Sequence, residues 1–188
     1  MRTRLACGTL CLSLLAGAAG LPASADEAAL SPELDAVRTA LEKYRDPIAA
    51  VRDGYLSTVG CVHYEDGAMG VHFLNMGLVG PTPDPMRPPI LIYEPSGDTL
   101  ELVAVEWFVP LATGIEKAPE LFGRTFDGPM EGHEPLMPAG LHHYDLHAWL
   151  FRPNPAGVFN TVNPDVDCSG AGSYSLAEAP PKMVMHGQ

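Results

Sequence analysis

The sequence predicts an α+β fold in which an N-terminal amphipathic helix packs on an antiparallel β-sheet or an open β-barrel. Three observations support this class. Apolar residues recur at spacings of three and four after Ser31, short segments rich in β-branched and aromatic residues follow from Tyr55 onward, and long loops rich in Pro and Gly separate them. A chain of 188 residues is long enough to bury a core in one domain.

The helix is expected to begin at Ser31, with Pro32 and Glu33 in its first turn, because a serine N-cap, an early proline and an early acidic residue favour helix starts. One face is apolar and should be packed: Leu34, Val37, Leu41, Tyr44, Ile48 and Val51. Pro47 disfavours helical geometry at Asp46, which predicts a kink there or a second helix capped by Asp46. The polar face is mixed rather than basic, which argues against a membrane-surface helix.

Six segments have the composition of strands: Tyr55–Tyr64, Gly70–Asn75, Ile90–Glu94, Leu100–Val109, Tyr144–Phe151 and Val158–Val162. The third and fourth flank a Pro-Ser-Gly-Asp turn and form the clearest hairpin. The fourth is almost entirely apolar, as in a strand covered on both faces. Glu106 lies within it, and a carboxylate there is costly unless it is paired or bound to a cation.

Two long loops interrupt this pattern. Pro81–Pro89 contains five prolines in nine residues, and Pro110–Pro138 is too long for a simple turn. The second loop has apolar anchors, Leu121, Phe122 and Phe126, and is therefore expected to be ordered and folded over the sheet. The C-terminal part, residues 169–188, is expected to be a weakly ordered tail.

Residues 1–25 have the features of a secretory signal peptide, with Arg2 and Arg4 before an apolar run and Ala23-Ser-Ala25 as a cleavage site. Residues 26–168 then form a single secreted globular domain, periplasmic or extracellular, with no further segment that inserts into a membrane. Removing the two arginines changes the formal charge from −12 to −14, which argues against nucleic acid and anionic membranes as partners.

The mature chain retains two cysteines, Cys61 and Cys168, since Cys7 and Cys11 belong to the predicted signal peptide. In an oxidising compartment such a pair most often forms a disulfide. Metal binding by the cysteine pair is the alternative. Free-thiol titration separates the two.

Four of the seven histidines lie in residues 128–151: His133, His142, His143 and His147. In a strand, His143, Asp145 and His147 share one face. The two histidines are then about 13 Å apart along the strand, so they cannot bind one ion unless the strand bends. Asp145 is close enough to act with either of them.

The number of histidines in the predicted strands and loops favours binding of a transition metal as the function, because imidazole is the commonest metal ligand. The candidate ligands are His63, His72, His133 and His147, with Glu106, Asp145 and His143 as reserves. The metal is expected to be zinc or, because Met69, Met130 and Met137 lie near the histidines, copper.

Two other functions stay open on the same residues. The first is a metal-dependent hydrolase or oxygenase, with Glu134 or Glu106 as the base. The second is a module that binds without metal or is purely structural, in which the histidines form hydrogen bonds between loops. Motifs for a nucleophilic serine and for a phosphate-binding glycine loop are missing from the sequence.

Two resemblances accompany these residues. Gly132, Pro138, Gly140, His143 and His147 are spaced similarly to the second cupin motif over 16 residues, with His147 in place of the usual Asn and without the first cupin motif upstream. The segments GCVH (60–63), VEWFVP (105–110), GHEP (132–135) and YDLHAW (144–149) resemble an uncharacterised family of secreted bacterial proteins. This second resemblance extends from Tyr44 to Cys168. It implies one exported domain and no particular reaction.

Overall fold

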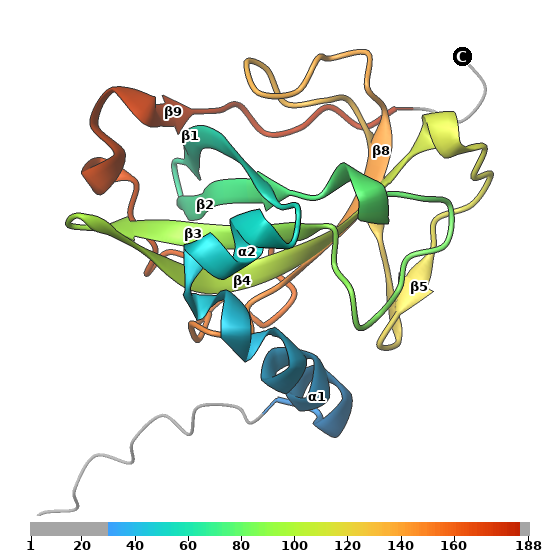
Figure 1. Ribbon diagram of the computed structural model, residues 1–188. Helices are drawn as coiled ribbons and strands as arrows, with labels where there is room; N and C mark the ends of the chain where they lie inside the picture. Colours follow the sequence, from blue (N-terminus) through green and yellow to red (C-terminus); the bar gives the residue numbers. More distant parts are fainter. Residues whose placement is uncertain (1–29, 185–188) are drawn as a thin grey trace, which may run out of the picture.

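The computed structural model describes residues 30–184, so the predicted signal peptide and the last four residues lie outside the described part of the chain. A short helical segment accompanies a large curled sheet (Figure 1). This sheet has seven strands in the order β7-β8-β4-β3-β2-β1-β9. The strands of this sheet are β1 (Leu56–Tyr64), β2 (Gly67–Leu74), β3 (Ile90–Ser96), β4 (Thr99–Pro110), β7 (Asp127–Met130), β8 (His143–Ala148) and β9 (Ser175–Ala177). The α+β class is therefore confirmed.

The helical segment begins and breaks where the sequence indicates. Helix α1 (Pro32–Leu41) is capped by the Ser31 side chain, and a 3₁₀ turn, η1 (Glu42–Arg45), follows it. At Asp46 the backbone is extended, and its carboxylate accepts from the Ile48 N–H to start α2 (Pro47–Arg52). The outcome is thus a second helix rather than a kink.

The expected apolar face is buried only up to this break. Leu34, Val37, Leu41 and Tyr44 are buried in the core. Ile48 and Val51 are 55% and 47% exposed, and Ala50 is buried in their place. Their predicted burial is wrong because the extended residue at Asp46 gives α2 a new direction, so the earlier periodicity no longer applies to it.

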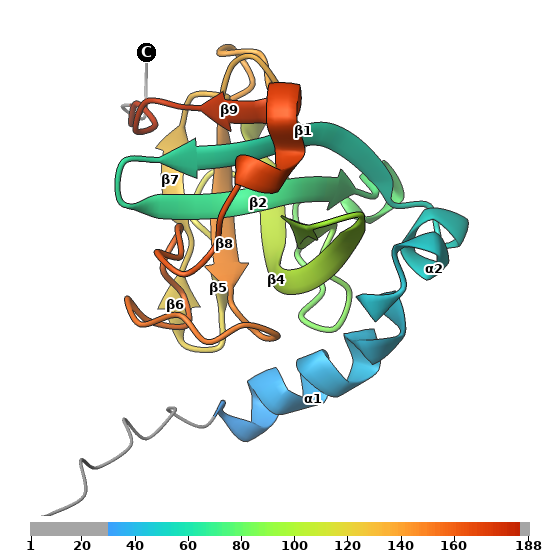
Figure 2. The same cartoon turned by 90° about the vertical axis from the view of Figure 1, so that its left-hand side faces the viewer.

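The sheet is antiparallel except at one edge. Strands β1 and β9 pair in parallel, with Cys61 opposite Ser175 and His63 opposite Ala177, so the sheet is mixed rather than antiparallel. This departure is possible because β9 follows β1 after a long excursion of the chain and is not held in a hairpin. Strands β1, β2 and β9 run across the direction of β7 and β8 (Figure 2), which gives the sheet its half-barrel curl.

The long connection from Pro110 is ordered, as expected. It contains the 3₁₀ turn η3 (Leu111–Thr113) and a small hairpin of β5 (Glu120–Leu121) and β6 (Arg124–Thr125), then adds β7 to the sheet beside β8. Phe126 is buried, and Phe122 packs against the Trp107 ring at 5.2 Å. The loop after β2 carries η2 (Met76–Leu78), and its Asp84 carbonyl accepts from the Trp107 indole N–H.

One predicted strand end and one predicted strand are wrong in the segment from Tyr144 to Val162. Strand β8 ends at Ala148 rather than Phe151, and residues 158–162 form turns instead of a return strand. Local hydrogen bonds compete with strand pairing there, because Asn154 and Asn160 each accept, through their side chains, from a backbone N–H two residues ahead. Only Asn163 makes a bridge, opposite Ala68, in this part of the described chain.

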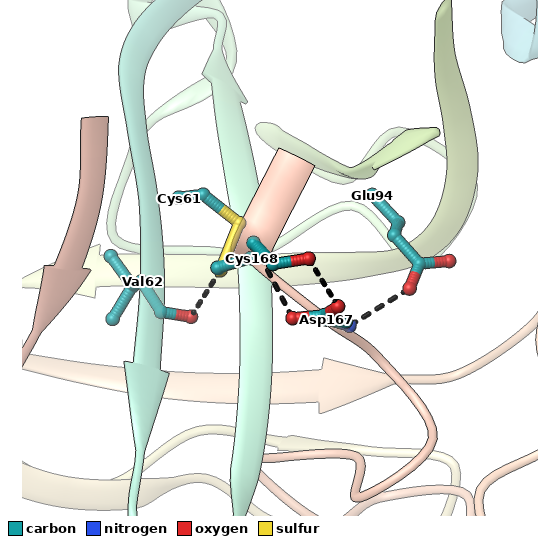
Figure 3. Close-up of a disulfide and its surroundings, with 6 residues drawn as sticks. Cys61, Val62, Glu94, Asp167 and Cys168 are labelled. Atoms are coloured by element: carbon teal, nitrogen blue, oxygen red, sulfur yellow. Dashed lines mark hydrogen bonds between the residues drawn. A yellow bond between two sulfur atoms is a disulfide. The ribbon is translucent and has the colours of Figure 1, made fainter. Parts of the chain in front are cut away.

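Cys61 and Cys168 form a disulfide across 107 residues, as predicted (Figure 3). It attaches the segment after β8 to β1, and Glu94 on β3 accepts from the Asp167 N–H beside it. The following residues form η4 (Ser169–Tyr174) and β9, so the first part of the segment expected to be a tail joins the sheet. No helix within residues 30–184 is long and apolar enough to cross a membrane.

Candidate metal centre

Strand β8 places three chemically active side chains on one face. His143, Asp145 and His147 alternate along it and are all buried. Asp145 lies between the two histidines: Oδ2 is 3.5 Å from His143 Nε2, and Oδ1 is 3.9 Å from His147 Nδ1. The predicted arrangement of this strand is therefore correct, with the two histidines on one face but separated by Asp145.

Glu106 on β4 lies directly opposite His147 on β8 in the strand ladder. Its Oε2 is 3.5 Å from His147 Nε2 and 3.3 Å from His72 Nε2, so one carboxylate oxygen faces two imidazoles. Burial alone raises the pKa of Glu106, but the charge of His147 and the hydrogen bond from His72 outweigh it and lower the pKa to about 2. Glu106 is thus a buried carboxylate that is held ionised.

His72 comes from β2, two strands away from β4 in the sheet, and is opposite Ile92 of β3. The curl of the sheet closes the gap that a flat sheet would leave between β2 and β8. As a result, ligand atoms of His72, Glu106 and His147 all lie within 4.8 Å of one another. The His72 and His147 rings are perpendicular, with centroids 6.4 Å apart.

The imidazole of His147 is exceptional in its lack of partners. Its side chain is only 2% exposed, yet neither ring nitrogen has a hydrogen-bond partner in residues 30–184. The Asp145 Oδ1 that faces it is also without a partner among the described residues. Since buried polar atoms are nearly always hydrogen-bonded, a ring with two unsatisfied nitrogens beside two carboxylates is able to accept a further ligand.

A second group of polar side chains adjoins this centre. His133, on the loop between β7 and β8, has Nδ1 3.2 Å from Glu178 Oε2, and Tyr64 Oη donates to the same oxygen at 3.1 Å. The His133 ring packs against the His143 ring with centroids 5.5 Å apart. His133 Nε2 and Glu178 Oε1 are buried without a hydrogen-bond partner in the described chain.

The remaining candidates lie elsewhere. His63 lines a separate pocket of about 580 Å³ with Asp167, Cys168 and Ser169. Hydrogen bonds from Ser169 are the main cause of the lowered pKa of Asp167, and the charge of His63 makes a smaller contribution. Glu134 is exposed on its loop, although it follows His133 directly. Cys61 and Cys168 are joined to each other and so do not bind metal.

Two residues of this cluster were missed by sequence reasoning. Tyr64 adjoins His63 in β1 and, by strand alternation, belongs to the opposite face. Glu178 follows β9, and its backbone N–H bonds to the His63 carbonyl. The alternation of β1 could have indicated Tyr64, whereas no local pattern marks Glu178, because its position depends on the parallel pairing of β9 with β1.

The three-residue group His72, Glu106 and His147 has dimensions suited to a metal ion. Ligand bonds of about 2.0–2.1 Å in a tetrahedral zinc site place neighbouring donor atoms roughly 3.3–3.4 Å apart. Two of the three donor–donor distances, 3.3 and 3.5 Å, are close to this value. The half-buried His72 and His133 give the cluster its contact with solvent, since their side chains are each 14% exposed.

Comparisons with known proteins add no family to this geometry. No protein-family model matches the chain, and neither a curated protein nor a solved structure was found to match it.

Proposed function

We propose that this is an exported metal-binding protein whose primary site is formed by His72, Glu106 and His147. The observation that supports it most directly is His147, a buried imidazole with no hydrogen-bond partner at either nitrogen in the described chain and with ligand atoms of two further residues within 4.8 Å. A metal ion at Nε2 would satisfy that nitrogen of His147 and place a positive charge directly beside the ionised Glu106.

A purely structural role for the histidines explains less. In that role each histidine ring would hydrogen-bond to the backbone or side chain of a nearby segment, as His143 does with the Leu141 carbonyl. His147 makes no such bond within residues 30–184. The structural role accounts for Nδ1 of His143 and of His133, which have hydrogen-bond partners, but it leaves unexplained His147, the buried ring that has no partner at either nitrogen among the described residues.

Zinc is the metal that fits the three donors best. Two imidazoles and one carboxylate form a known zinc ligand set, which keeps a further position open for water or substrate. Copper is the second choice, because thioether sulfur, which favours copper(I), is not among the three donors.

Export is part of this proposal. The signal-peptide features of residues 1–25 lie outside the described chain, but the Cys61–Cys168 disulfide fits an oxidising compartment such as the periplasm or the extracellular space. Metal capture would then take place after export.

An enzyme on the same site is the second candidate function. Only three protein ligands converge in the described group, so a bound ion would retain an open position, and His72 gives that position access to solvent. Hydrolysis by a metal-activated water is the reaction class that such a site supports. Titrating the cobalt-loaded protein with azide would reveal an exchangeable position through a change in its visible spectrum, whereas an unchanged spectrum would favour storage or transport.

Elemental analysis tests the primary site. The protein should be purified from the periplasm without a histidine tag, since a tag would itself bind metal. We expect stoichiometric zinc in the wild type and loss of primary-site zinc in His147→Ala. His142→Ala is the matched control. It removes the histidine next to His143 in the sequence, and the His142 side chain makes no hydrogen bond, ion pair or ring contact with any of residues 30–184. Metal-free protein under every loading condition would refute the proposal.

A further inference from the structure

We propose that the histidine cluster holds a second metal ion, bound by Nε2 of His133 and Nε2 of His143, with Asp145 between the two ions. This inference rests on the proposed function, because it places the second ion beside the His72–Glu106–His147 site. Three features support a second ion: the tautomers of the two histidines, the spacing of their rings and the position of Asp145.

The tautomer of His143 is determined by its neighbour. Its Nδ1 lies 3.2 Å from the Leu141 carbonyl oxygen, which can only accept, so Nδ1 carries the hydrogen and donates. In the neutral ring Nε2 then has the lone pair, and this lone pair faces Asp145 Oδ2 at 3.5 Å. Two acceptors that face each other in a buried site are unfavourable, and a cation shared by both removes the conflict. A proton on Nε2 would also remove it. Burial lowers the pKa of His143, but the hydrogen bond to Asp145 and the charge of that carboxylate outweigh burial and raise it, so a proton competes with the ion and the experiment must count metal.

His133 is oriented in the same sense by a different partner. Tyr64 Oη donates its one hydrogen to Glu178 Oε2 at 3.1 Å, so its oxygen can only accept at its 3.2 Å contact with His133 Nδ1. Glu178 Oε2 also lies 3.2 Å from this nitrogen, so Nδ1 faces two acceptors and carries the hydrogen. The lone pair is then on Nε2, which is buried and has no partner in the described chain. A carboxylate that holds the far nitrogen of an imidazole is the usual arrangement behind a metal-binding histidine.

The spacing of the two rings suits a shared ion. Two imidazoles bound to one tetrahedral ion through nitrogen bonds of about 2.0–2.1 Å have their ring centroids roughly 5 Å apart. The His133 and His143 centroids are 5.5 Å apart and the rings are inclined by 51°. Within residues 30–184, the group of three residues whose ligand atoms all lie within 4.8 Å of one another is His72, Glu106 and His147. Binding at the second site therefore requires His133, on the loop between β7 and β8, to move toward His143 in β8.

Asp145 links the two sites through its two oxygens. Oδ2 faces His143 Nε2 and would bind the second ion, whereas Oδ1 faces His147 Nδ1 at 3.9 Å and would accept from it. His147 would thereby present Nε2 to the first ion, on the side of Glu106. Oδ1 has no hydrogen-bond partner among residues 30–184, so it is free to accept a hydrogen bond from His147 Nδ1.

The experiment counts metal in three variants. Tag-free protein, stripped with a chelator and checked by circular dichroism, should be loaded with Zn²⁺ or Co²⁺, passed over a desalting column and analysed for metal per chain. We expect two ions in the wild type and in His142→Ala, and one ion in His133→Ala. Glu178→Gln keeps the His133 ring but weakens its orientation, so the affinity for the second ion should fall by about 10–100-fold while the first is unchanged.

The outcomes distinguish this inference from the primary proposal. One ion in the wild type and one in His133→Ala would overturn the second site and leave the primary site standing. Loss of both ions in a folded His133→Ala variant would show a single site that includes His133, and would also overturn the second site. Absence of metal from the wild type would refute the primary proposal itself. If His143 Nε2 carries a proton instead of binding a metal ion, the wild type and His133→Ala will each contain one ion.

Discussion

Glu106 Oε2 lies 3.5 Å from His147 Nε2, and the two residues are directly opposed in the ladder between β4 and β8. Both side chains are almost completely buried, so the orientation of each is determined by its strand rather than by a mobile loop. A rigid strand pair is a precise way to fix two ligands of one ion, and the third, His72, is brought in by the curl of the sheet.

Replacing Glu106 by Gln should therefore weaken metal binding strongly at the primary site. The amide has the same size but lacks the charge that attracts the cation, so we expect metal affinity to fall by roughly 100-fold or more. Isothermal titration with Zn²⁺ measures the change. Glu120→Gln is the control, since it neutralises an exposed carboxylate on β5. Wild-type affinity in the Glu106 variant would remove Glu106 from the ligand set.

Zinc should stabilise the folded protein. A ligand that binds only the native state adds about 2.7 kcal/mol at 100 times its Kd, which corresponds to a rise in Tm of roughly 5–10 °C for a chain of this size. Calorimetry of stripped protein with and without Zn²⁺ measures this rise. Because His147→Ala lacks a ligand of the primary site, it should show a clearly smaller rise, and an equal shift in both proteins would contradict the assignment.

The disulfide should contribute a large share of stability. Closing 107 residues of chain lowers the entropy of the unfolded state, and the double substitution Cys61→Ser with Cys168→Ser should cost about 4 kcal/mol. Urea unfolding monitored by circular dichroism gives the difference. A midpoint equal to that of the oxidised wild type would mean that the bond does not constrain the unfolded chain in this way.

The ion pair between Arg152 and Glu94 should also be important for folding. Arg152 Nη2 donates to Glu94 Oε2 at 2.7 Å, and the Glu94 side chain is 11% exposed. Because Arg152→Ala would leave a largely buried carboxylate without its cation, we expect a loss of about 2–3 kcal/mol of unfolding free energy. Adding Glu94→Gln to this variant should recover part of the loss, and no recovery would show that the arginine acts through packing alone.

Buried tyrosines should make the fold sensitive to alkaline pH. Burial raises the pKa of both Tyr55 and Tyr93, whose hydroxyls donate to the carbonyls of Pro88 and Tyr44. A raised pKa in the folded state means that this stability is complete below the unfolded-state value of about 10 and is lost as pH rises above it. Tm should therefore fall steeply above about pH 10 and less steeply in Tyr93→Phe. Tyr174→Phe, at an exposed position, should retain the wild-type slope.

The parts of the fold that follow from local chemistry were predictable. Ser31 and Asp46 cap helices through their own side chains. The turn at Gly97 and Asp98 joins two strands that pair with each other, within the predicted Pro-Ser-Gly-Asp segment. The parallel pairing of β9 with β1 was not predictable, because it depends on a segment held in place by a distant disulfide. Residues 158–162 were predicted as a strand from their composition, and local asparagine hydrogen bonds prevailed.

The candidate centre was predictable to a similar extent. Strand alternation indicated that Asp145 and His147 share a face, and the cost of a carboxylate in an apolar strand singled out Glu106. Sequence alone could not separate His72 from His63, since each is one histidine in a short strand. The curl of the sheet brings His72 to Glu106, whereas His63 lines another pocket. Tyr64 and Glu178 needed the three-dimensional pairing of β1 with β9 to become visible.

The position of Glu178 has a consequence for the order in which the protein matures. This residue directly follows β9, which comes after all the other strands of the sheet in chain order, and the segment beyond it contacts β7 through the bridge between Met130 and Met183. A polypeptide still being synthesised or exported would lack this segment, even if β1 to β8 had already formed. The polar cluster around His133 is thus completed last. A chain truncated before Glu178 could acquire its disulfide and its sheet and still leave His133 without the carboxylate that orients it.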